Sequence, residues 1–262
     1  PLGSAGAAAA PLLVDRRLQR LLSYRHELTR ADLYSLSRFA DRAPLKLAIS
    51  GATGTIGRAL TPFLLAGGHA VRRMTRRAEH PGDVDWSHEQ GRIEVVKLDG
   101  LDAVVHLAGE NIAARWTESR KKRILDSRAI GTRFLCETLA RLSRPPRVLV
   151  SASAVGIYGD RGDETLTEES PLPARPADFL GEVTREWETA TEPARAAGIR
   201  VVNLRFGIIL TPAGGALAKL LPPFRLGLGG RIGTGRQWMS WIGIDDVVGA
   251  IHHALLTDSL SG

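Results

Sequence analysis

The chain has 262 residues, with 35 Lys and Arg against 28 Asp and Glu, a formal net charge of +7, and 44% hydrophobic residues. These proportions are ordinary for a soluble globular protein, and they exclude collagen-like, disordered and disulfide-scaffold classes. No apolar run approaches the ~18–20 residues that a membrane span needs, so we expect no membrane partner. Cys136 is the only cysteine, which excludes an intrachain disulfide and favours a reducing, cytoplasmic setting.

The positive charge does not by itself indicate a nucleic-acid-binding protein. Arginines are scattered along the chain, and the densest basic run covers residues 120–123. A nucleic-acid-binding protein should cluster its charge with aromatic residues or within a recognisable module. The basic run is better explained as a solvated helix face, so we expect no nucleic-acid partner.

The N-terminal part differs in composition from the rest of the chain. Residues 1–4, Pro-Leu-Gly-Ser, are typical of a protease-cleavage cloning scar and lack the basic start of a signal peptide. Low-complexity sequence at 5–11 predicts a linker, and leucines at helical spacing over 15–39 predict one or two amphipathic helices. We therefore expect a linker and helical segment over 5–43, ahead of one domain over 44–262.

From Leu45 onward, strand-like and helix-like segments alternate. Apolar, strand-prone runs lie at 45–50, 69–77, 102–109, 147–153 and 199–207. Helices are expected at 58–68, at 117–142 with Thr117 as N-cap, at 178–197, and from Asp245 or Asp246 to about Leu256, with a loop over 78–91. The strands are continuous apolar runs, which is typical of a parallel sheet covered on both faces. The expected fold class is a doubly wound, parallel-sheet α/β Rossmann fold.

A glycine-rich turn lies between the first strand and the first helix of this pattern. Gly51, Gly54 and Gly57 have the spacing that permits a tight turn, a close backbone approach to a pyrophosphate, and close helix–strand packing. Because this is the first strand-to-helix turn of an alternating pattern, we favour a dinucleotide site over an ordinary turn. The other expected cofactor contacts in the turn are Thr53, Thr55 and Ile56.

The end of the second strand indicates which dinucleotide binds. A site for NAD places Asp or Glu there to bind the ribose 2′-hydroxyl. This chain instead has Arg76 and Arg77. Guanidinium groups match a 2′-phosphate in geometry and charge, so NADP(H) is the predicted cofactor, with Arg76 the better candidate. The alternative is that both are ordinary surface arginines.

Five blocks in order together resemble the epimerase-family atypical short-chain dehydrogenase/reductases. They are GATGTIG (51–57), DAVVHLAGENIA (102–113), SASAVGIYGD (151–160), GGALAKLLPPFRLGLGG (214–230) and GRQWMSWIGIDDVV (235–248). The resemblance covers about residues 45–262. It implies an NADP(H)-binding core with a small substrate subdomain built from insertions around 154–178 and 207–243, C-terminally incomplete at Gly262. The stretch 23–33 also looks like the tail of a preceding lipid-binding-like domain.

The resemblance implies a catalytic Tyr and Lys that this chain lacks. They map to Phe179 and Val183, and neither side chain can donate a proton or carry a charge. The supporting Asn of the superfamily falls near Ser127 or Arg128. Of the four standard positions, only the serine is matched, by Ser153.

Tyr158, five residues after Ser153, is the other candidate for the missing acid. A tyrosine with an unperturbed pKa of ~10 needs a cationic neighbour to work near neutrality. Arg128 or Arg205 could serve, although packing or substrate stacking is the simpler explanation of Tyr158. We assign a catalytic role to Ser153 and Tyr158 as a hypothesis.

The remaining expected site residues follow strand ends or a Trp-rich loop. Ligands of open α/β sheets bind at the carboxyl ends of the strands. The further cofactor contacts expected there are Leu107, Ala108, Gly109, Ser151 and Arg205. The expected substrate-pocket residues are Glu110, Asn111, Arg236, Trp238, Ser240 and Trp241, the tryptophans having core packing as the alternative. His106 is expected to be structural, and no metal site is expected.

Two functions remain open on the sequence alone. The first is an NADP(H)-dependent oxidoreductase or epimerase-like enzyme that acts on a small-molecule substrate of unknown identity with a non-standard proton donor. The second is an NADP(H)-binding redox sensor or regulatory protein without turnover. The glycine turn supports both, whereas Phe179 and Val183 favour the second or an unusual version of the first.

Overall fold

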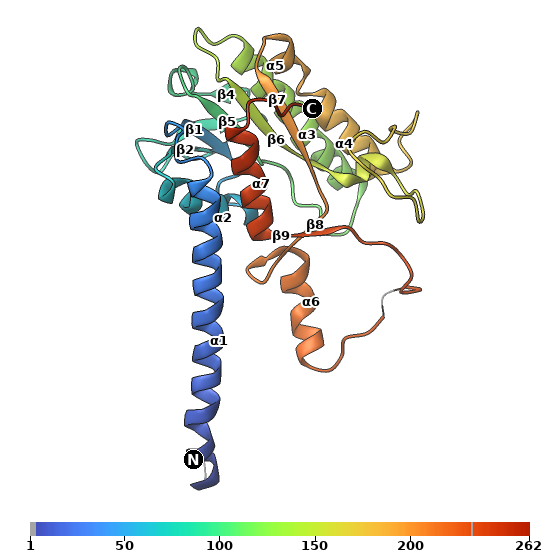
Figure 1. Ribbon diagram of the computed structural model, residues 1–262. Helices are drawn as coiled ribbons and strands as arrows, with labels where there is room; N and C mark the ends of the chain where they lie inside the picture. Colours follow the sequence, from blue (N-terminus) through green and yellow to red (C-terminus); the bar gives the residue numbers. More distant parts are fainter. Residues whose placement is uncertain (1–3, 232) are drawn as a thin grey trace. The chain divides into compact units, whose positions relative to one another are not determined.

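The computed structural model describes residues 4–231 and 233–262, and the chain divides into two units, Pro1–Ala43 and Pro44–Gly262. In the first unit, α1 (Ser4–Ser37) is one helix, drawn in blue in Figure 1. It includes residues 5–11, where the sequence predicts a linker, so this expectation is wrong at the level of secondary structure. The expected cloning scar lies mostly outside the described residues, apart from Ser4.

The second unit is built on a seven-stranded sheet of order β4-β3-β2-β1-β5-β6-β7. All neighbouring strands are parallel except the antiparallel pair β3 and β4. The strands are β1 (Lys46–Ser50), β2 (Ala70–Thr75), β3 (Val84–Ser87), β4 (Arg92–Ile93), β5 (Ala103–His106), β6 (Val148–Ala154) and β7 (Arg200–Phe206). The order reverses between β1 and β5, which confirms the predicted doubly wound Rossmann fold.

Helices pack in two groups beside this sheet (Figure 1). One group pairs α2 with α7, and the other pairs α3 with α4 and α5. Their bounds are α2 (Thr55–Ala66), α3 (Glu118–Ala140), α4 (Phe179–Thr189), α5 (Glu192–Ala196) and α7 (Ile244–Leu256). Thr117 caps α3 by accepting a hydrogen bond from the Arg120 backbone N–H at 3.3 Å, as the sequence predicts.

One core cluster lies between the central strands and α3. Fully buried side chains come from the middle of each strand and from the apolar face of the helix: Ala48, Val104, Leu149, Leu135, Cys136 and Leu139. Burial raises the pKa of the Cys136 thiol to about 12. The only cysteine therefore packs as a small apolar residue.

Three boundaries differ from the sequence-based expectation. Strand β3 lies inside the predicted loop 78–91, and its Trp86 side chain is buried. Strand β4 and a short 3₁₀ helix η1 (Val95–Lys97) follow that loop, in a stretch for which no element was predicted. The expected helix 178–197 is two helices, with Thr191 between them and Pro193 in the first turn of the second. The N-cap of α7 is Gly243, so the two aspartates lie in its first turn.

Smaller elements occupy the two predicted insertions. The 3₁₀ helix η2 (Val155–Tyr158) starts the first insertion. The second contains β8 (Ile208–Thr211), α6 (Gly215–Arg225) and β9 (Trp241–Gly243), with β8 and β9 forming a separate parallel pair. Within the described part of the chain, no helix is both long and apolar enough to cross a membrane.

Candidate functional site

The glycine turn between β1 and α2 has a geometry that only glycine satisfies at two of its positions. Gly51 has φ +73°, and a Cβ there would lie 2.8 Å from the Leu107 carbonyl and 2.9 Å from the Ala108 nitrogen. A Cβ on Gly57 would lie 2.4 Å from the Gly51 oxygen. The turn is therefore packed directly against the segment that follows β5, as a dinucleotide-binding turn requires.

A cavity of about 300 Å³ opens at the N-terminus of α2. It is lined by Thr53, Gly54, Thr55, Arg58 and Ala213. The helix N-terminus supplies free N–H groups and positive partial charge, and Arg58 adds a full charge. Ala213 comes from the loop between β8 and α6, so the second insertion borders this cavity. The residues fit a pyrophosphate group, and Arg58 is a contact that sequence reasoning missed.

A buried polar network fixes the segment after β5. Ser50 Oγ lies 2.6 Å from His106 Nδ1 and accepts from the Leu107 and Ala108 backbone N–H groups at 3.2 and 3.3 Å. Since both acceptor positions of this hydroxyl are used, Ser50 donates to Nδ1 and His106 Nε2 donates to Thr132 Oγ1 at 3.0 Å. Burial lowers the pKa of His106 to about 3. His106 is thus a neutral structural histidine that positions residues 107–109.

Arg76 and Arg77 lie directly after β2, at the carboxyl edge of the sheet. Both are exposed, and within the described ranges neither guanidinium has an ion-pair partner. The Arg77 backbone N–H donates to Thr75 Oγ1 at 3.3 Å, which turns the chain after the strand. The preceding Arg73, by contrast, is bound by Asp83 through two hydrogen bonds of 2.9 and 2.8 Å. The two uncommitted guanidiniums are therefore those at the predicted 2′-phosphate position.

The two candidate catalytic residues lie in one network with Arg205. Neighbouring strands β6 and β7 place Ser153 opposite Arg205. Arg205 donates to both carboxylate oxygens of Glu188 at 2.8 and 2.9 Å, and its Nη1 donates to Tyr158 Oη at 2.7 Å. Ser153 Oγ donates to Glu188 Oε1 at 2.6 Å. Bonding to Glu188, and then to Tyr158, raises the pKa of Arg205.

Of the two arginines named as possible cationic neighbours of Tyr158, Arg205 is the one that contacts it. The Arg205 guanidinium also lies over the Tyr158 ring, 5.1 Å from its centroid. Ser153 points its proton toward Glu188, and the cofactor contact predicted for Arg205 stays a prediction, because its described bonds are internal. Sequence reasoning missed Glu188, because nothing in its position near the end of a helix sets it apart.

The positions of the missing Tyr and Lys are used for packing. Phe179 starts α4 and contacts the Trp116 ring edge-on, with centroids 5.5 Å apart, while Lys121 Nζ lies 5.8 Å from its ring centroid. Val183 is buried. Both substitutions are therefore consistent with the apolar surroundings in which they lie.

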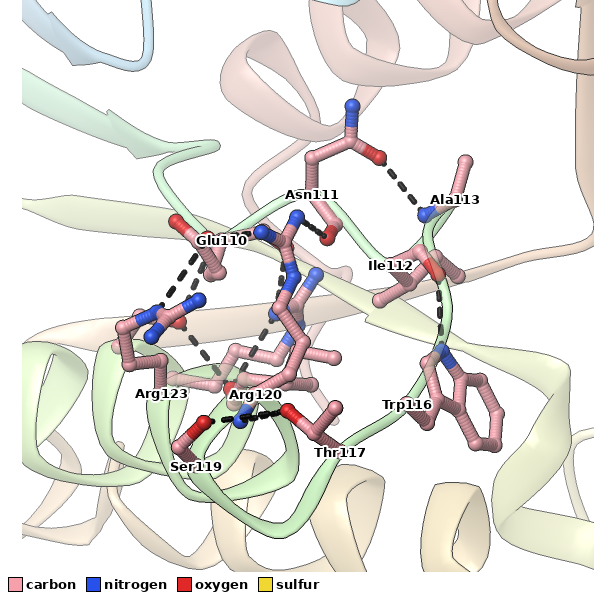
Figure 2. A network of polar contacts seen from close by, with 12 residues as sticks. Glu110, Asn111, Ile112, Ala113, Trp116, Thr117, Ser119, Arg120 and Arg123 are labelled. Carbon is pink, nitrogen blue, oxygen red and sulfur yellow. Dashed lines mark hydrogen bonds and ion pairs between the residues drawn. The ribbon is translucent and has the colours of Figure 1, made fainter.

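The loop after β5 is held by its own polar contacts, shown in Figure 2. Glu110 pairs with Arg120 at 3.2 Å and lies 3.8 Å from Arg123, and Arg120 donates to the Asn111 carbonyl at 2.7 Å. Asn111 Oδ1 accepts from the Ala113 N–H at 2.8 Å. The side chains of Glu110 and Asn111, predicted as substrate contacts, here stabilise the loop. Ser151 is fully buried in β6.

The Trp-rich loop is exposed in this structure. Trp238 and Trp241 are 76% and 66% exposed, and Arg236 and Ser240 are also exposed. Trp238 Nε1 donates to Asp163 Oδ1 at 2.6 Å, which joins the two insertions. The tryptophans are therefore not core residues of a subdomain. Their predicted pocket role stays a prediction.

Metal ligation finds no support among the described residues, where no group of three or more His, Cys, Asp or Glu side chains could hold an ion. His252 lies buried in α7, edge-on to Phe63 and His69. Burial lowers its pKa to about 4, so it packs as a neutral ring.

Comparison with known proteins agrees with this geometry. The family model of the NAD dependent epimerase/dehydratase family matches residues 47–261. The chain belongs to this family. Its match begins inside β1 and covers the sheet, the glycine turn and both insertions.

Relatives within the family show how far the likeness extends. An epimerase family protein of Mycobacterium bovis is 42% identical over 218 residues, which cover 82% of this chain and 71% of the relative. The crystal structure of human epimerase family protein SDR39U1 with NADPH is similar at 35% identity and a TM-score of 0.74, covering 83% of this chain and 72% of that one.

A crystal structure described as a nucleoside-diphosphate sugar epimerase from Corynebacterium glutamicum matches over 92% of this chain at 42% identity, with a TM-score of 0.81. This chain spans about half, 51%, of the length of that protein.

Proposed function

We propose that the chain is an NADP(H)-binding protein of the atypical short-chain dehydrogenase/reductase type. One observation carries the proposal: the glycine turn, packed without room for a side chain against Leu107 and Ala108, opens at the α2 N-terminus onto a cavity of about 300 Å³. The similar human protein, whose structure contains NADPH, supports it. Thr53, Gly54, Thr55 and Arg58 would hold the pyrophosphate.

The preference for NADP(H) over NAD(H) is proposed from the end of β2. No carboxylate occupies the ribose 2′-hydroxyl position directly after the strand, and Arg76 and Arg77 are exposed there. Each charge-assisted contact to a 2′-phosphate contributes about 1.5–3 kcal/mol, or roughly 10–100-fold in affinity. A cationic strand end therefore favours the phosphorylated cofactor.

We further propose that Tyr158 supplies the proton in an oxidoreductase or epimerase-like reaction. When bound, the cofactor supplies hydride transfer. Tyr158 Oη accepts from Arg205 Nη1, so its own proton must point away from the guanidinium. This hydrogen bond fixes the position of the Tyr158 hydroxyl. Glu188 holds Arg205 in place, and Ser153 is a positioning residue for that carboxylate.

The second candidate function, NADP(H) binding without turnover, is favoured by α4. Phe179 and Val183 are packed at the positions where the superfamily has its acid and activating cation. Losing a positioned general acid costs roughly 10²–10⁴ in rate. A relative without that pair can retain cofactor binding while losing ordinary turnover.

Cofactor binding is tested by titrating NADPH and NADH separately into the purified protein and measuring both affinities by calorimetry. We expect NADPH to bind about 10–100-fold more tightly, and Arg76→Ala to remove most of that preference. Arg147→Ala is the matched control, since this exposed arginine pairs with Asp102 ahead of β5 and β6, at the opposite edge of the sheet. Equal affinities, or a preference that survives in Arg76→Ala/Arg77→Ala, would contradict the assignment.

Catalysis is tested by following NADPH absorbance with a panel of carbonyl compounds and nucleotide sugars. If a substrate is turned over, Tyr158→Phe should lower kcat by about 10²-fold or more with little change in NADPH affinity. Turnover that Tyr158→Phe leaves intact would remove Tyr158 from the chemistry. Tight NADPH binding with no turnover across the panel would favour the non-catalytic alternative.

A further inference from the structure

Arg128, near the middle of α3, is a half-buried cation that forms no ion pair with any of the described residues. Its Nη1 donates to the Glu110 and Ile124 carbonyls at 3.1 and 3.3 Å. Among the residues that the structure describes, no carboxylate lies within ion-pair distance of it, and its Nε and Nη2 have no hydrogen-bond partner. Burial lowers its pKa to about 10, since the guanidinium loses hydration without gaining an anion.

Two other half-buried arginines of the domain show how the edge formed by Nε and Nη2 can bind an anion. Arg73 places Nε and Nη2 on Asp83 at 2.9 and 2.8 Å, and Arg205 places the same two atoms on Glu188 at 2.8 and 2.9 Å. This two-pronged geometry is the one in which Arg binds carboxylate and phosphate groups. Arg128 has the same edge available and no internal partner for it.

The surroundings fix the Arg128 guanidinium in place. A Cβ on Gly109 would lie 3.1 Å from its Cζ and Nη2 and 3.3 Å from its Nη1, so the group lies flat against Gly109. It also lies over the Trp187 ring, 4.9 Å from the centroid. Packing against Gly109 and Trp187 and bonding through Nη1 leave the Nε–Nη2 edge for a ligand.

The local charge balance also favours an added anion. The nearby Glu110 carboxylate, whose charge favours the cationic form of Arg128, is already paired with Arg120 at 3.2 Å. The Trp187 Nε1 donor is buried and has no hydrogen-bond partner within the described ranges. Donors therefore exceed acceptors around Arg128. Its neighbour Gly109 follows directly on Leu107 and Ala108, the segment packed on the glycine turn.

We propose that the Nε–Nη2 edge of Arg128 binds a carboxylate or phosphate oxyanion of a ligand at the carboxyl edge of the sheet. The inference rests on the proposed function, because that function places a dinucleotide and its substrate at this edge. The oxyanion belongs either to the substrate or to the cofactor pyrophosphate. If it belongs to the substrate, the substrate class is an acid or a phosphate ester rather than a neutral carbonyl compound.

The test titrates oxalate and inorganic phosphate into the free protein and into the protein saturated with NADPH, by calorimetry. Wild type should bind at least one of the two anions saturably. Arg128→Gln should weaken that binding by about 10-fold or more, whereas the matched control Arg123→Gln should not. Arg123 lies on the same helix with the same charge, and its side chain is about half exposed, at 55%. The ¹⁵N-resolved Nε–H signal of Arg128 should shift during the titration.

The two sources of the anion give different results. If it belongs to the substrate, wild type binds oxalate or phosphate with NADPH already bound, and Arg128→Gln keeps its NADPH affinity. If it belongs to the pyrophosphate, NADPH displaces the small anion, and Arg128→Gln weakens NADPH binding about 10-fold. Arg128→Lys keeps the positive charge but lacks the two parallel N–H donors of the guanidinium, so we expect a loss of anion affinity smaller than that of Arg128→Gln. Arg128→Lys replaces Arg128→Gln in the test if the latter fails to fold.

Unchanged affinities for oxalate, phosphate and NADPH in folded Arg128→Gln or Arg128→Lys would overturn the inference. An equal loss in Arg123→Gln would overturn it too, because the effect would then be general charge. If wild type binds no NADPH, the proposed function fails, but anion binding by the free protein still tests Arg128 on its own.

Discussion

Glu188 is the residue on which the Arg205 network depends. Its carboxylate accepts two hydrogen bonds from Arg205 and one from Ser153, all between 2.6 and 2.9 Å. Glu188→Ala removes all three and leaves the guanidinium without a counter-charge. Breaking a fully buried ion pair costs about 3–5 kcal/mol. The two side chains are 22% and 14% exposed, so water recovers part of this, and we expect a loss of about 2–4 kcal/mol.

The assay is guanidinium denaturation followed by circular dichroism, compared with Glu192→Ala. Glu192 forms the same kind of pair with Arg195 at 2.9 Å on α5, but there the side chains are exposed. That control should cost about 0–1 kcal/mol. Glu188→Gln, which keeps two polar atoms near Arg205, should recover part of the loss. If Glu188→Ala costs no more than Glu192→Ala, our view of this network as a buried, structure-determining pair is refuted.

Three further predictions concern the glycine turn, the buried His106 and α4. Gly54→Val should abolish NADPH binding in calorimetry while the circular dichroism spectrum stays native, since a Cβ there already lies 3.2 Å from the Gly51 oxygen; retained binding would mean an ordinary turn. Burial lowers the pKa of His106 from about 6.5 in the unfolded chain to about 3 in the folded protein. The neutral, buried His106 ring therefore contributes its full stabilisation above pH ~6.5, and this stabilisation is lost as the pH falls toward 3. His106→Gln should therefore reduce the slope of unfolding free energy against pH between pH 6.5 and 4 by about 1.4 kcal/mol per pH unit. Urea denaturation at several pH values measures this slope. A slope that is unchanged in His106→Gln would exclude His106 as the source of the pH dependence. Val183→Lys restores the cation of the superfamily, but we expect no turnover of NADPH. The variant should also destabilise the fold by several kcal/mol, because position 183 is buried. A Val183→Lys protein that is both stable and active would contradict this prediction.

Much of the domain was determined by the sequence itself. Continuous apolar runs and the glycine spacing predicted a doubly wound sheet and its first turn, because both signals are local in the chain. Thr117 as a helix cap is another local feature that the structure confirms. The sequence-based prediction failed for β3, whose Trp86 is buried in the folded domain. It also missed the local signal of Pro193, which lies in the first turn of α5 and marks the start of a second helix.

The polar part of the site was decided only by the tertiary structure. Tyr158, Glu188 and Arg205 come from three separate segments, and the β6–β7 register brings Arg205 beside Ser153, so the sequence could name two possible cations for Tyr158 but not choose one. Arg128 and Gly109 lie 19 positions apart in the sequence, yet they are in contact because α3 packs beside the end of β5. The partner of a charged side chain depends on which elements pack together. Which elements pack together is a property of the assembled sheet and helices, whereas a turn or a helix cap is determined by a few consecutive residues.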